Sequence, residues 1–336
     1  MKRFLSLFRM FRHLSFKRMN LHIREVHKES GACRVRIFFD MIWCGLQYGI
    51  GYLDYHVFGF VSKPARVRRT YMTAHHNNAL VRRMNDREYY YVFDDKCTFD
   101  KRFSEFLGRK FMDLRESDAE GLKAFCAGHE SVFAKATEKC GGADISRVEI
   151  TPDLDYDALY KELYDNGQFL IEEAIVQHPE MNRLCASSVN TVRIVTLLLP
   201  DGAHFVYALV RMSNGSAVVD NISSGGMYTS VHEDGTLYPL AFCDKTGLTY
   251  EEHPMTHTRF ADFRIPFFDE AVATCLRAAE VEPHMRYVGW DVAITPDGPV
   301  FVEGNNLPGY DMCQNAYHRT EGLLPTFEKI LGEKIG

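Results

Sequence analysis

The chain has 336 residues, 46% of them hydrophobic and 25% charged, which is typical of a globular protein with material for two or three domains or lobes. Its formal net charge of −6 argues against nucleic acid as the main partner. The nine cysteines are scattered and never spaced C-x-x-C, which favours a reducing compartment over a disulfide framework or a structural zinc site.

The first nineteen residues, MKRFLSLFRMFRHLSFKRM, interleave basic and apolar side chains, which predicts a basic amphipathic helix. The apolar run from Phe4 to Phe8 is too short for a signal-peptide core or a membrane span. One interpretation packs this helix on the protein's own body or on a second copy in a homodimer. The other places it on an anionic membrane surface or a membrane-bound partner. We therefore expect a cytoplasmic protein, either free or peripheral at the inner face of the membrane.

The pattern along the chain predicts a mainly helical N-terminal region, residues 1–88, followed by strands and helices together. Helical patterns cover 101–129, 155–165 and 267–281. The expected strands are Tyr89–Phe93, Ser131–Lys135, Arg147–Thr151, Gln168–Glu172, Thr191–Leu199, His204–Arg211, Ala217–Asn221 and the two arms of a hairpin within 288–306. Paired strands with interspersed helices indicate an α+β architecture with mostly antiparallel sheet.

Two segments of the first half have patterns suited to a nucleotide. A strand ending in Lys135 runs into a loop that contains Gly141 and Gly142, and such a loop can cover phosphates with its backbone N–H groups. The segment Glu172–Ile175 ends a strand in acids followed by an apolar pair, and can present backbone groups to an adenine edge. Taken singly, an ordinary hairpin and a plain strand end explain these patterns as well.

Two arginines and a polar corner follow in the second half. Arg193 lies inside a strongly apolar strand, and a buried arginine must find an anion, either a ligand phosphate or a structural carboxylate. Arg211 ends the next strand. The segment DNISSGG, with Asn221, Gly225 and Gly226, can offer backbone donors to a developing negative charge.

The hairpin VGWDVAITPDGPVFVEGNN carries one carboxylate in each arm. The connection TPDGP predicts a three-residue loop with a G1 bulge, in which Thr295 faces Pro299 and Asp291 faces Glu303. Asn305 lies two residues beyond Glu303 and points to the same face. A two-residue loop would instead put the acids on opposite faces of the sheet.

Two facing carboxylates on a half-buried sheet repel each other, and a divalent cation would remove the conflict. Ligation by Asp, Glu and Asn oxygens suits Mg²⁺ together with substrate phosphates. The alternative is a solvated sheet face on which the acids are incidental.

The order of these motifs along the chain resembles that of the ATP-grasp superfamily. The motifs are the strand lysine with its glycine loop, the Glu-Glu segment, the arginine strand, the Gly-Gly corner and D-x(11)-E-x-N. Three segments are most similar to the sugar-transfer-associated ATP-grasp proteins, and more distantly to the ribosomal-protein glutamate ligases. They are QHPEMNRLCASSVNTVRIVTL, VDNISSGG and VGWDVAITPDGPVFVEGNNLPGYD. The resemblance covers about residues 90–320. It implies an ATP-grasp fold in which two α+β lobes, 89–173 and 174–336, clasp ATP.

The resemblance also implies roles for individual residues. Lys135 and Lys96 would hold the phosphates, with Lys101 as the competitor of Lys96. Two Mg²⁺ ions would be bound by Asp291, Glu303 and Asn305, while Arg193 and Arg211 stabilise the transferred phosphoryl group. The residues expected around the adenosine are Glu172, Glu173, Ala174 and Ile175 at the adenine and Gln177 or Glu180 at the ribose.

The function that the resemblance implies is ATP-dependent ligation of a carboxylate to an amine through an acyl phosphate. The expected substrates are small or glycan-linked carboxylates and amines in polysaccharide or cell-surface glycan modification, without nucleic acid. One alternative is a kinase of a sugar or polyol hydroxyl with Asp311 or Asp220 as base; another is a nucleotide-binding scaffold without catalysis. The first 85 residues differ from the usual N-terminal domain of such ligases, which leaves the acceptor open.

Overall fold

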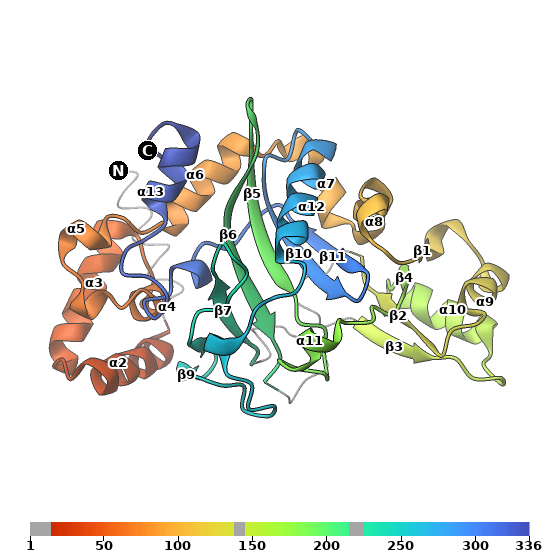
Figure 1. The fold of residues 1–336 in the computed structure, drawn as a ribbon, viewed down its shortest axis with the longest axis horizontal. Coiled ribbons are helices and arrows are strands. Elements are labelled where there is room, and N and C mark those ends of the chain that lie inside the picture. Colours follow the sequence, from red (N-terminus) through yellow and green to blue (C-terminus); the bar gives the residue numbers. More distant parts are fainter. Residues whose placement is uncertain (1–14, 138–144, 215–224, 336) are drawn as a thin grey trace. The chain divides into compact units, whose positions relative to one another are not determined.

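The computed structural model describes residues 15–137, 145–214 and 225–335 (Figure 1). The chain forms two compact units. The first unit consists of two chain segments, the residues up to Arg82 and those from Gly309 onward, and the second unit is Arg83–Pro308. Residues 309–336, which the sequence analysis assigned to the second lobe, thus belong to the same unit as the N-terminal region.

The first unit is helical, as predicted for the N-terminal region. Its elements are α2 (Phe16–Ser30), α3 (Arg34–Tyr48), α4 (Tyr52–Val57), the 3₁₀ helices η1 (Phe60–Ser62) and η7 (Met312–Gln314), α5 (Ala65–Arg68), α13 (Leu324–Leu331) and most of α6 (Ala74–Met84). Ser15 caps α2 by accepting a hydrogen bond from the N–H of Arg18, and Gly31 ends it with a φ of 68°. The helix predicted for the first nineteen residues lies mostly outside the described residues. No described helix is long and apolar enough to cross a membrane.

A half-buried ion pair fixes the packing of α3 within this unit. Arg68 donates to both carboxylate oxygens of Asp40, at 2.7 and 2.8 Å. The hydroxyl of Tyr55 donates to the same carboxylate at 2.6 Å. The returning C-terminal segment is held by Gln314, whose side chain accepts from the N–H of Met72 and donates to its carbonyl.

The second unit contains a four-stranded antiparallel sheet in the order β1–β4–β2–β3. Its strands are β1 (Phe111–Asp113), β2 (Ser131–Lys135), β3 (Ile145–Glu149) and β4 (Leu170–Glu173). The helices of this unit between residues 87 and 165 are η2 (Arg87–Tyr89), α7 (Tyr91–Asp94), α8 (Lys96–Arg102), η3 (Ser104–Phe106), η4 (Leu114–Glu116), α9 (Ala119–Cys126) and α10 (Tyr156–Asp165). Leu122 of α9 and Leu163 of α10 pack with Val132 and Ile171 of the sheet in a core of their own.

The same unit contains a seven-stranded antiparallel sheet in the order β11–β10–β5–β6–β7–β8–β9. Its strands are β5 (Val192–Leu199), β6 (Gly202–Met212), β7 (Met227–Val231), β8 (Ala241–Cys243), β9 (Leu248–Tyr250), β10 (Tyr287–Thr295) and β11 (Gly298–Asn305), and its helices are α11 (Pro179–Asn182), η6 (Phe260–Asp262) and α12 (Phe268–Val281). The helix α12 covers one face of this sheet (Figure 1). Trp290 and Phe301 belong to the hydrophobic core of this seven-stranded sheet, which is separate from the core of the four-stranded sheet. Two sheets with two cores confirm the predicted α+β architecture.

Two predicted elements are wrong. Tyr89–Phe93 is helical and not a strand, because Asp86 accepts a hydrogen bond from a backbone N–H two residues on and starts a helical turn. Residues 101–129 are not one helix but the end of α8 followed by η3, β1, η4 and α9, because the side chains of Asp113 and Asp118 cap new helical turns, η4 and α9, inside the segment.

The remaining predicted elements are present with small shifts. The strand predicted at Ser131–Lys135 and the helices predicted at 155–165 and 267–281 agree with β2, α10 and α12. The predicted strand Ala217–Asn221 lies outside the described residues. The short strands β7, β8 and β9 were not predicted.

Candidate functional site

The hairpin of β10 and β11 brings its two acids together by a route that differs from the predicted one. Thr295 pairs with Gly298, so the loop has two residues and the predicted pairing of Thr295 with Pro299 is wrong. The register then shifts between Asp291 and Val292, which makes a β-bulge. This bulge restores the pairing of Asp291 with Glu303, so both side chains lie on the same face.

Two arginines neutralise the carboxylate of Asp291. Arg193 is the direct neighbour of Asp291 on β5 and donates to both of its oxygens, with Nη2 at 2.8 Å from Oδ2. Arg211 donates through Nη2 to Oδ2 at 2.6 Å and to the hydroxyl of Thr191 at 2.9 Å. Of the two anions considered for Arg193, the described structure therefore shows the carboxylate.

The arginines decide the electrostatics of this cluster. Asp291 is fully buried, which excludes the alternative of a solvated sheet face for this acid. Burial alone would raise the pKa of Asp291, but the positive charges of Arg193 and Arg211 outweigh it and hold the pKa below its usual range. We expected a divalent cation to remove the repulsion between Asp291 and Glu303, but guanidinium groups already relieve part of it.

Glu303 and Asn305 complete the cluster. Burial and the negative charge of Asp291 raise the pKa of Glu303. The side-chain amide of Asn305 lies 3.3 Å from the carbonyl of Gly289. Gly289 has a local reason to be glycine, since a Cβ there would approach Cδ of Arg193 to 3.1 Å.

The cluster fits Mg²⁺ by the chemistry of its donors. Asp291, Glu303 and Asn305 offer carboxylate and amide oxygens on one face, and a cation beside Glu303 would favour its ionised form over the protonated one. The oxygens of Asp291 already accept from arginine. Within 15–137, 145–214 and 225–335, no group of three or more His, Cys, Asp or Glu side chains could hold a metal ion.

A second buried charge cluster surrounds Glu172 at the end of β4. Its carboxylate accepts from Nε of Arg109 at 2.8 Å and forms an ion pair with Lys135 of β2. Burial would raise the pKa of Glu172, but Lys135 and Arg109 outweigh it and lower the pKa. The carboxylate of Glu172 therefore faces two cations, and Lys135 has a fixed position at the foot of the loop that follows it.

Arg109 and Asp100 belong to this cluster but were not predicted. Arg109 also donates to the carbonyl of Phe301 and so connects the smaller sheet with the hairpin. Burial and the negative charge of Glu172 raise the pKa of Asp100. Its Oδ2 has no hydrogen-bond partner among the described residues. The only sequence signal for Arg109 is indirect: a buried glutamate beside one lysine leaves room for a second cation.

A cavity of about 430 Å³ opens beside Glu172. It is lined by Arg109, Ser131, Phe133, Lys135, Ile145, Arg147, Glu172, Glu173, Ala174, Ile175, Gln177, Asn182, Ala186, Ser187, Ser188, Val189, Thr191 and Val302. Thr191 connects the cavity to the other cluster because its hydroxyl accepts from Arg211. The structure thus gathers Lys135, which was predicted at the phosphates, and the segment Glu172–Ile175, which was predicted at the adenine, around one space.

The two residues considered for the ribose lie differently. The side-chain amide of Gln177 lines the cavity but donates to Asn182 at 2.8 Å, and its oxygen accepts from the N–H of Asn190. It therefore braces the segment between β4 and β5. Glu180 forms an exposed ion pair with Arg183 and does not line this cavity.

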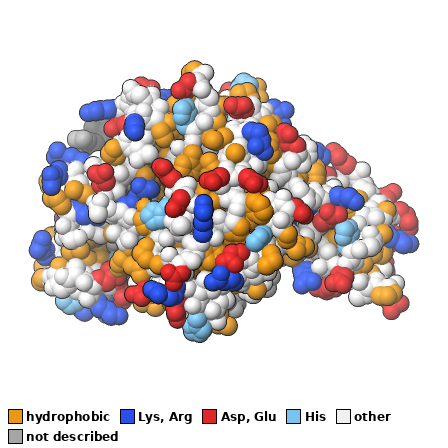
Figure 2. Space-filling model, in the orientation of Figure 1, with side chains coloured by type: hydrophobic (Ala, Val, Ile, Leu, Met, Phe, Trp, Pro, Cys, Tyr) orange, Lys and Arg blue, Asp and Glu red, His pale blue; other side chains and the backbone are white. Residues whose placement is uncertain are grey.

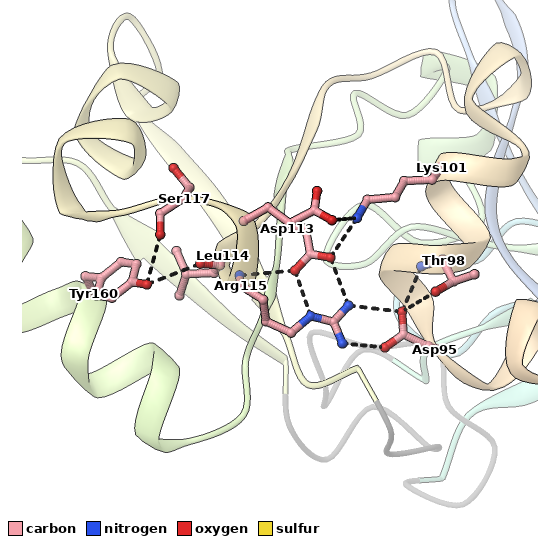
Figure 3. A network of polar contacts seen from close by, with 9 residues as sticks. Asp95, Thr98, Lys101, Asp113, Leu114, Arg115, Ser117 and Tyr160 are labelled. Carbon is pink, nitrogen blue, oxygen red and sulfur yellow. Dashed lines mark hydrogen bonds and ion pairs between the residues drawn. The ribbon is translucent and has the colours of Figure 1, made fainter.

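The structure separates the two candidates for the second phosphate lysine. Figure 3 shows Lys101 pointing to Asp113, with an Nζ–oxygen distance of 2.9 Å, and Lys101 also pairs with Glu116 at 2.7 Å. Arg115 joins Asp113 to Asp95, the N-cap of α8 (Figure 3). The backbone N–H of Lys96 lies 3.4 Å from the carbonyl of Thr137, just after β2. The backbone of Lys96 therefore lies next to the end of β2, whereas the ammonium group of Lys101 is paired with two acids.

The glycine positions are only partly described. Gly141, Gly142 and Asn221 lie outside the described residues. Gly225 and Gly226 come directly before β7, the neighbour of β6 and Arg211, and the φ of 102° at Gly225 favours glycine there.

Comparison with known proteins identifies a family model. The model described as sugar-transfer associated ATP-grasp matches residues 75–331. No curated protein matches the chain.

Several solved structures are similar to part of this chain. One is the ATP-grasp ligase PsnB in complex with a phosphomimetic variant of its minimal precursor, Mg and ADP (15% identity, TM-score 0.45, 74% of this chain and 61% of that chain). Another is D-alanyl-alanine synthetase A from Vibrio cholerae (12% identity, TM-score 0.43, 73% and 66%). A third is N5-carboxyaminoimidazole synthase from Aspergillus clavatus with ADP and 5-aminoimidazole ribonucleotide (9% identity, TM-score 0.39, 66% and 46%). In each case the chain spans less than two thirds of the other protein.

Proposed function

This chain belongs to the sugar-transfer associated ATP-grasp family, and from that premise we propose that it is an ATP-dependent ligase which joins a carboxylate to an amine through an acyl phosphate. One observation carries the proposal: the two buried charge clusters, around Glu172 and around Asp291, adjoin one cavity. The connection runs from Lys135 and Glu172 on the cavity wall through Thr191 to Arg211 and Asp291.

The charges around the cavity favour the triphosphate of ATP. Arg109, Lys135 and Arg211 bring three cations to this region, while Glu172 and Asp291 are the acids that hold them in place. Because these groups are positioned by ion pairs before any ligand arrives, little reorganisation is required when a phosphate binds. Lys96 is proposed as a further phosphate ligand from the glycine-loop side.

The reaction has two steps. A carboxylate oxygen attacks the γ-phosphorus of ATP and ADP leaves; the amine nitrogen then attacks the acyl carbon, phosphate leaves and the amine loses a proton. We assign Arg193 and Arg211 to stabilising the charge on the transferred phosphoryl group, with Asp291 fixing both guanidinium groups in orientation. The backbone of Gly225 and Gly226, next to Arg211 through β7, is proposed to donate to the acyl phosphate.

Mg²⁺ is proposed at Asp291, Glu303 and Asn305. Two bound Mg²⁺ ions would neutralise phosphate charge and polarise the γ-phosphoryl group. Glu303 would contribute its carboxylate in the ionised form. Asp291 would keep its arginine partners, since both of its oxygens already accept hydrogen bonds from Arg193.

The segment Glu172–Ile175 is proposed to line the adenine through its backbone groups. The carboxylate of Glu172 does not take part in this contact because it is paired with Arg109 and Lys135. The substrates are proposed to be small or glycan-linked carboxylates and amines, and the family's description supports only the link to sugar transfer. The protein is proposed to work in the cytoplasm. A homodimer and a role in glycan modification remain proposals of the sequence analysis.

The test is ADP release by the full chain across uronic acids, amino acids and carboxylated glycan intermediates, with and without Mg²⁺. We expect release that needs both Mg²⁺ and one class of carboxylate, with formation of a hydroxamate when hydroxylamine replaces the amine. Glu303→Gln, which keeps size and hydrogen bonding, should abolish release and leave the fold intact. Glu280→Gln, at an exposed position of α12 that does not line the cavity, is the matched control and should keep full activity.

A kinase would give a stable phosphomonoester instead of a hydroxamate, and that product would overturn the ligase proposal. Of the two bases considered for a kinase, Asp220 lies outside the described residues and Asp311 belongs to the first unit, so the reaction product is what distinguishes the two activities. ATP binding without turnover against any carboxylate would favour the scaffold alternative.

A further inference from the structure

The helix α3 carries an exposed apolar stripe that is unlike the rest of the first unit. Val35, Phe39, Trp43 and Leu46 are exposed by 63, 65, 57 and 50%. At 100° per residue these four positions lie within about 80° of the helix circumference, and they extend over about 16 Å of its length.

Two further apolar residues widen this stripe. Phe38 and Ile42 are half-buried and lie beside Val35 and Leu46 on the helical wheel, so that the whole arc of about 140° is apolar. The opposite side of the helix, with Ile37 and Met41 among others, is buried within the unit. We call the six exposed or half-buried residues, Val35, Phe38, Phe39, Ile42, Trp43 and Leu46, the α3 stripe. A contiguous exposed patch of this kind marks an interaction surface in a protein of ordinary composition.

Basic side chains surround the stripe. Arg34 and Arg36 are exposed at the start of α3. On the neighbouring α2, Lys17, Arg24 and Lys28 are exposed and recur at helical spacing on one side. Figure 2 shows Lys and Arg side chains along the edge of the molecule formed by α2, α3 and α5.

The charge of the chain is divided unequally between its two units. The first unit, residues 1–82 and 309–336, has 18 Lys and Arg against 8 Asp and Glu, a net charge of +10. The second unit has 21 against 37, a net charge of −16. The modest overall charge of −6 therefore conceals a strongly basic unit, and it is this unit that carries the apolar stripe.

We propose that the α3 stripe, with the basic side chains of α2 and α3 around it, binds the protein to the surface of a membrane rich in anionic lipid. A tryptophan and phenylalanines on one side of a helix, bordered by Arg and Lys, are the features of a helix that lies in the membrane interface. The apolar side chains enter the acyl boundary while the cations meet lipid phosphates. Apart from Lys17, the named residues of this surface lie outside the first nineteen residues, where the sequence alone placed a membrane contact.

Charge favours lipid over a second copy of the chain as the occupant. A symmetric dimer through the stripe would bring two basic surfaces together, and like charges at an interface oppose association. An anionic bilayer accepts both the aromatic side chains and the cations. Binding should therefore weaken as salt rises, because the electrostatic part is screened.

The two tryptophans of the chain provide a direct test. Trp43 is 57% exposed, whereas Trp290 is 1% exposed and lies in the core of the large sheet. When the full chain meets vesicles of phosphatidylcholine with about a third phosphatidylserine, Trp43 emission should shift to shorter wavelength and become sensitive to brominated lipid. Trp43→Phe should remove this signal while the protein still sediments with the vesicles.

The substitution pair Phe39→Ser with Trp43→Ser should reduce vesicle binding about tenfold or more, since each side chain loses its transfer from water to the acyl boundary. Met255→Ser is the matched control, because Met255 is 66% exposed but lies in the second unit; it should bind like the unchanged chain. Circular dichroism checks that the variants keep their helices.

A chain without residues 1–14 separates the two membrane surfaces, and it should retain binding that depends on Phe39 and Trp43. The inference is overturned by any of three results. These are no binding to anionic vesicles at low salt, binding that the Phe39 and Trp43 substitutions leave unchanged, or a lipid-free dimer that the same substitutions dissociate.

Discussion

Replacing Arg109 by methionine should lower the free energy of unfolding by about 3 kcal/mol. The side chains of Arg109 and Glu172 are only 4% and 1% exposed, so the substitution leaves a buried carboxylate short of one partner. Removing one member of a buried ion pair typically costs about 3–5 kcal/mol. Lys135 still pairs with Glu172, which places the expected loss at the lower end of that range.

Urea unfolding of the full chain, followed by circular dichroism, measures this loss. Arg183→Met is the matched control: the ion pair of Arg183 with Glu180 is exposed by 58 and 36%, and such pairs contribute about 0–1 kcal/mol. The double variant Arg109→Met with Glu172→Gln should lose less than the two single variants together, because neither buried charge is then left without the other. A loss for Arg109→Met as small as that of the control, or strict additivity in the double variant, would refute the reasoning.

Three further predictions concern the same unit. Burial and the negative charge of Glu172 raise the pKa of Asp100, so the native state keeps a proton that the unfolded chain releases near pH 4. The free energy of unfolding should therefore fall as the pH rises above about 4. Asp100→Asn should remove this decline, which urea unfolding at pH 5 and 7.5 measures. Gly304→Ala should cost about 1–3 kcal/mol, because its Cβ would come within 2.5 Å of the ring of Phe99; an unchanged urea midpoint would contradict this contact. Removal of divalent ions with EDTA should stop ADP release but leave the thermal midpoint unchanged, because arginines already neutralise Asp291; a large drop would show that the metal is part of the fold.

The elements that the sequence predicted well are those whose patterns are local. The strand Ser131–Lys135 follows from alternation. The helix α10 follows from helical spacing and its N-cap Asp155, and α12 follows from helical spacing alone, since no side chain caps its start. The aromatic run Tyr89–Phe93 misled the prediction because β-propensity reflects packing on a sheet. Here Phe93 enters the core from a helical turn, Tyr89 and Tyr90 pack against that core, and Tyr91 is exposed.

The hairpin shows how a correct contact can follow from an incorrect turn. We predicted a bulge at the loop, and the structure has a two-residue loop with the bulge beside Asp291 instead. Either bulge restores the facing of Asp291 and Glu303, since each changes the register by one residue. Local turn residues do not disclose a bulge in the middle of a ladder, and so its position was beyond the sequence.

The partners of the buried charges were the least predictable part of the site. The sequence indicated that Arg193 needs an anion and that Asp291 needs a cation, but not that each satisfies the other across neighbouring strands. Only an indirect signal pointed to Arg109, because it comes from a loop and its partner Glu172 lies 63 residues away in the chain. Such pairings depend on strand order, which is set by the whole fold.

The central claim, that a carboxylate is activated as an acyl phosphate, is tested most directly by tracing oxygen. The full chain is supplied with ATP, Mg²⁺, an amine and a carboxylate labelled with oxygen-18, and the released phosphate is analysed by mass. We predict that one labelled oxygen enters phosphate for each amide formed, since the carboxylate oxygen that attacks the γ-phosphorus leaves with it. Unlabelled phosphate, or label retained in full by the product, would contradict the account.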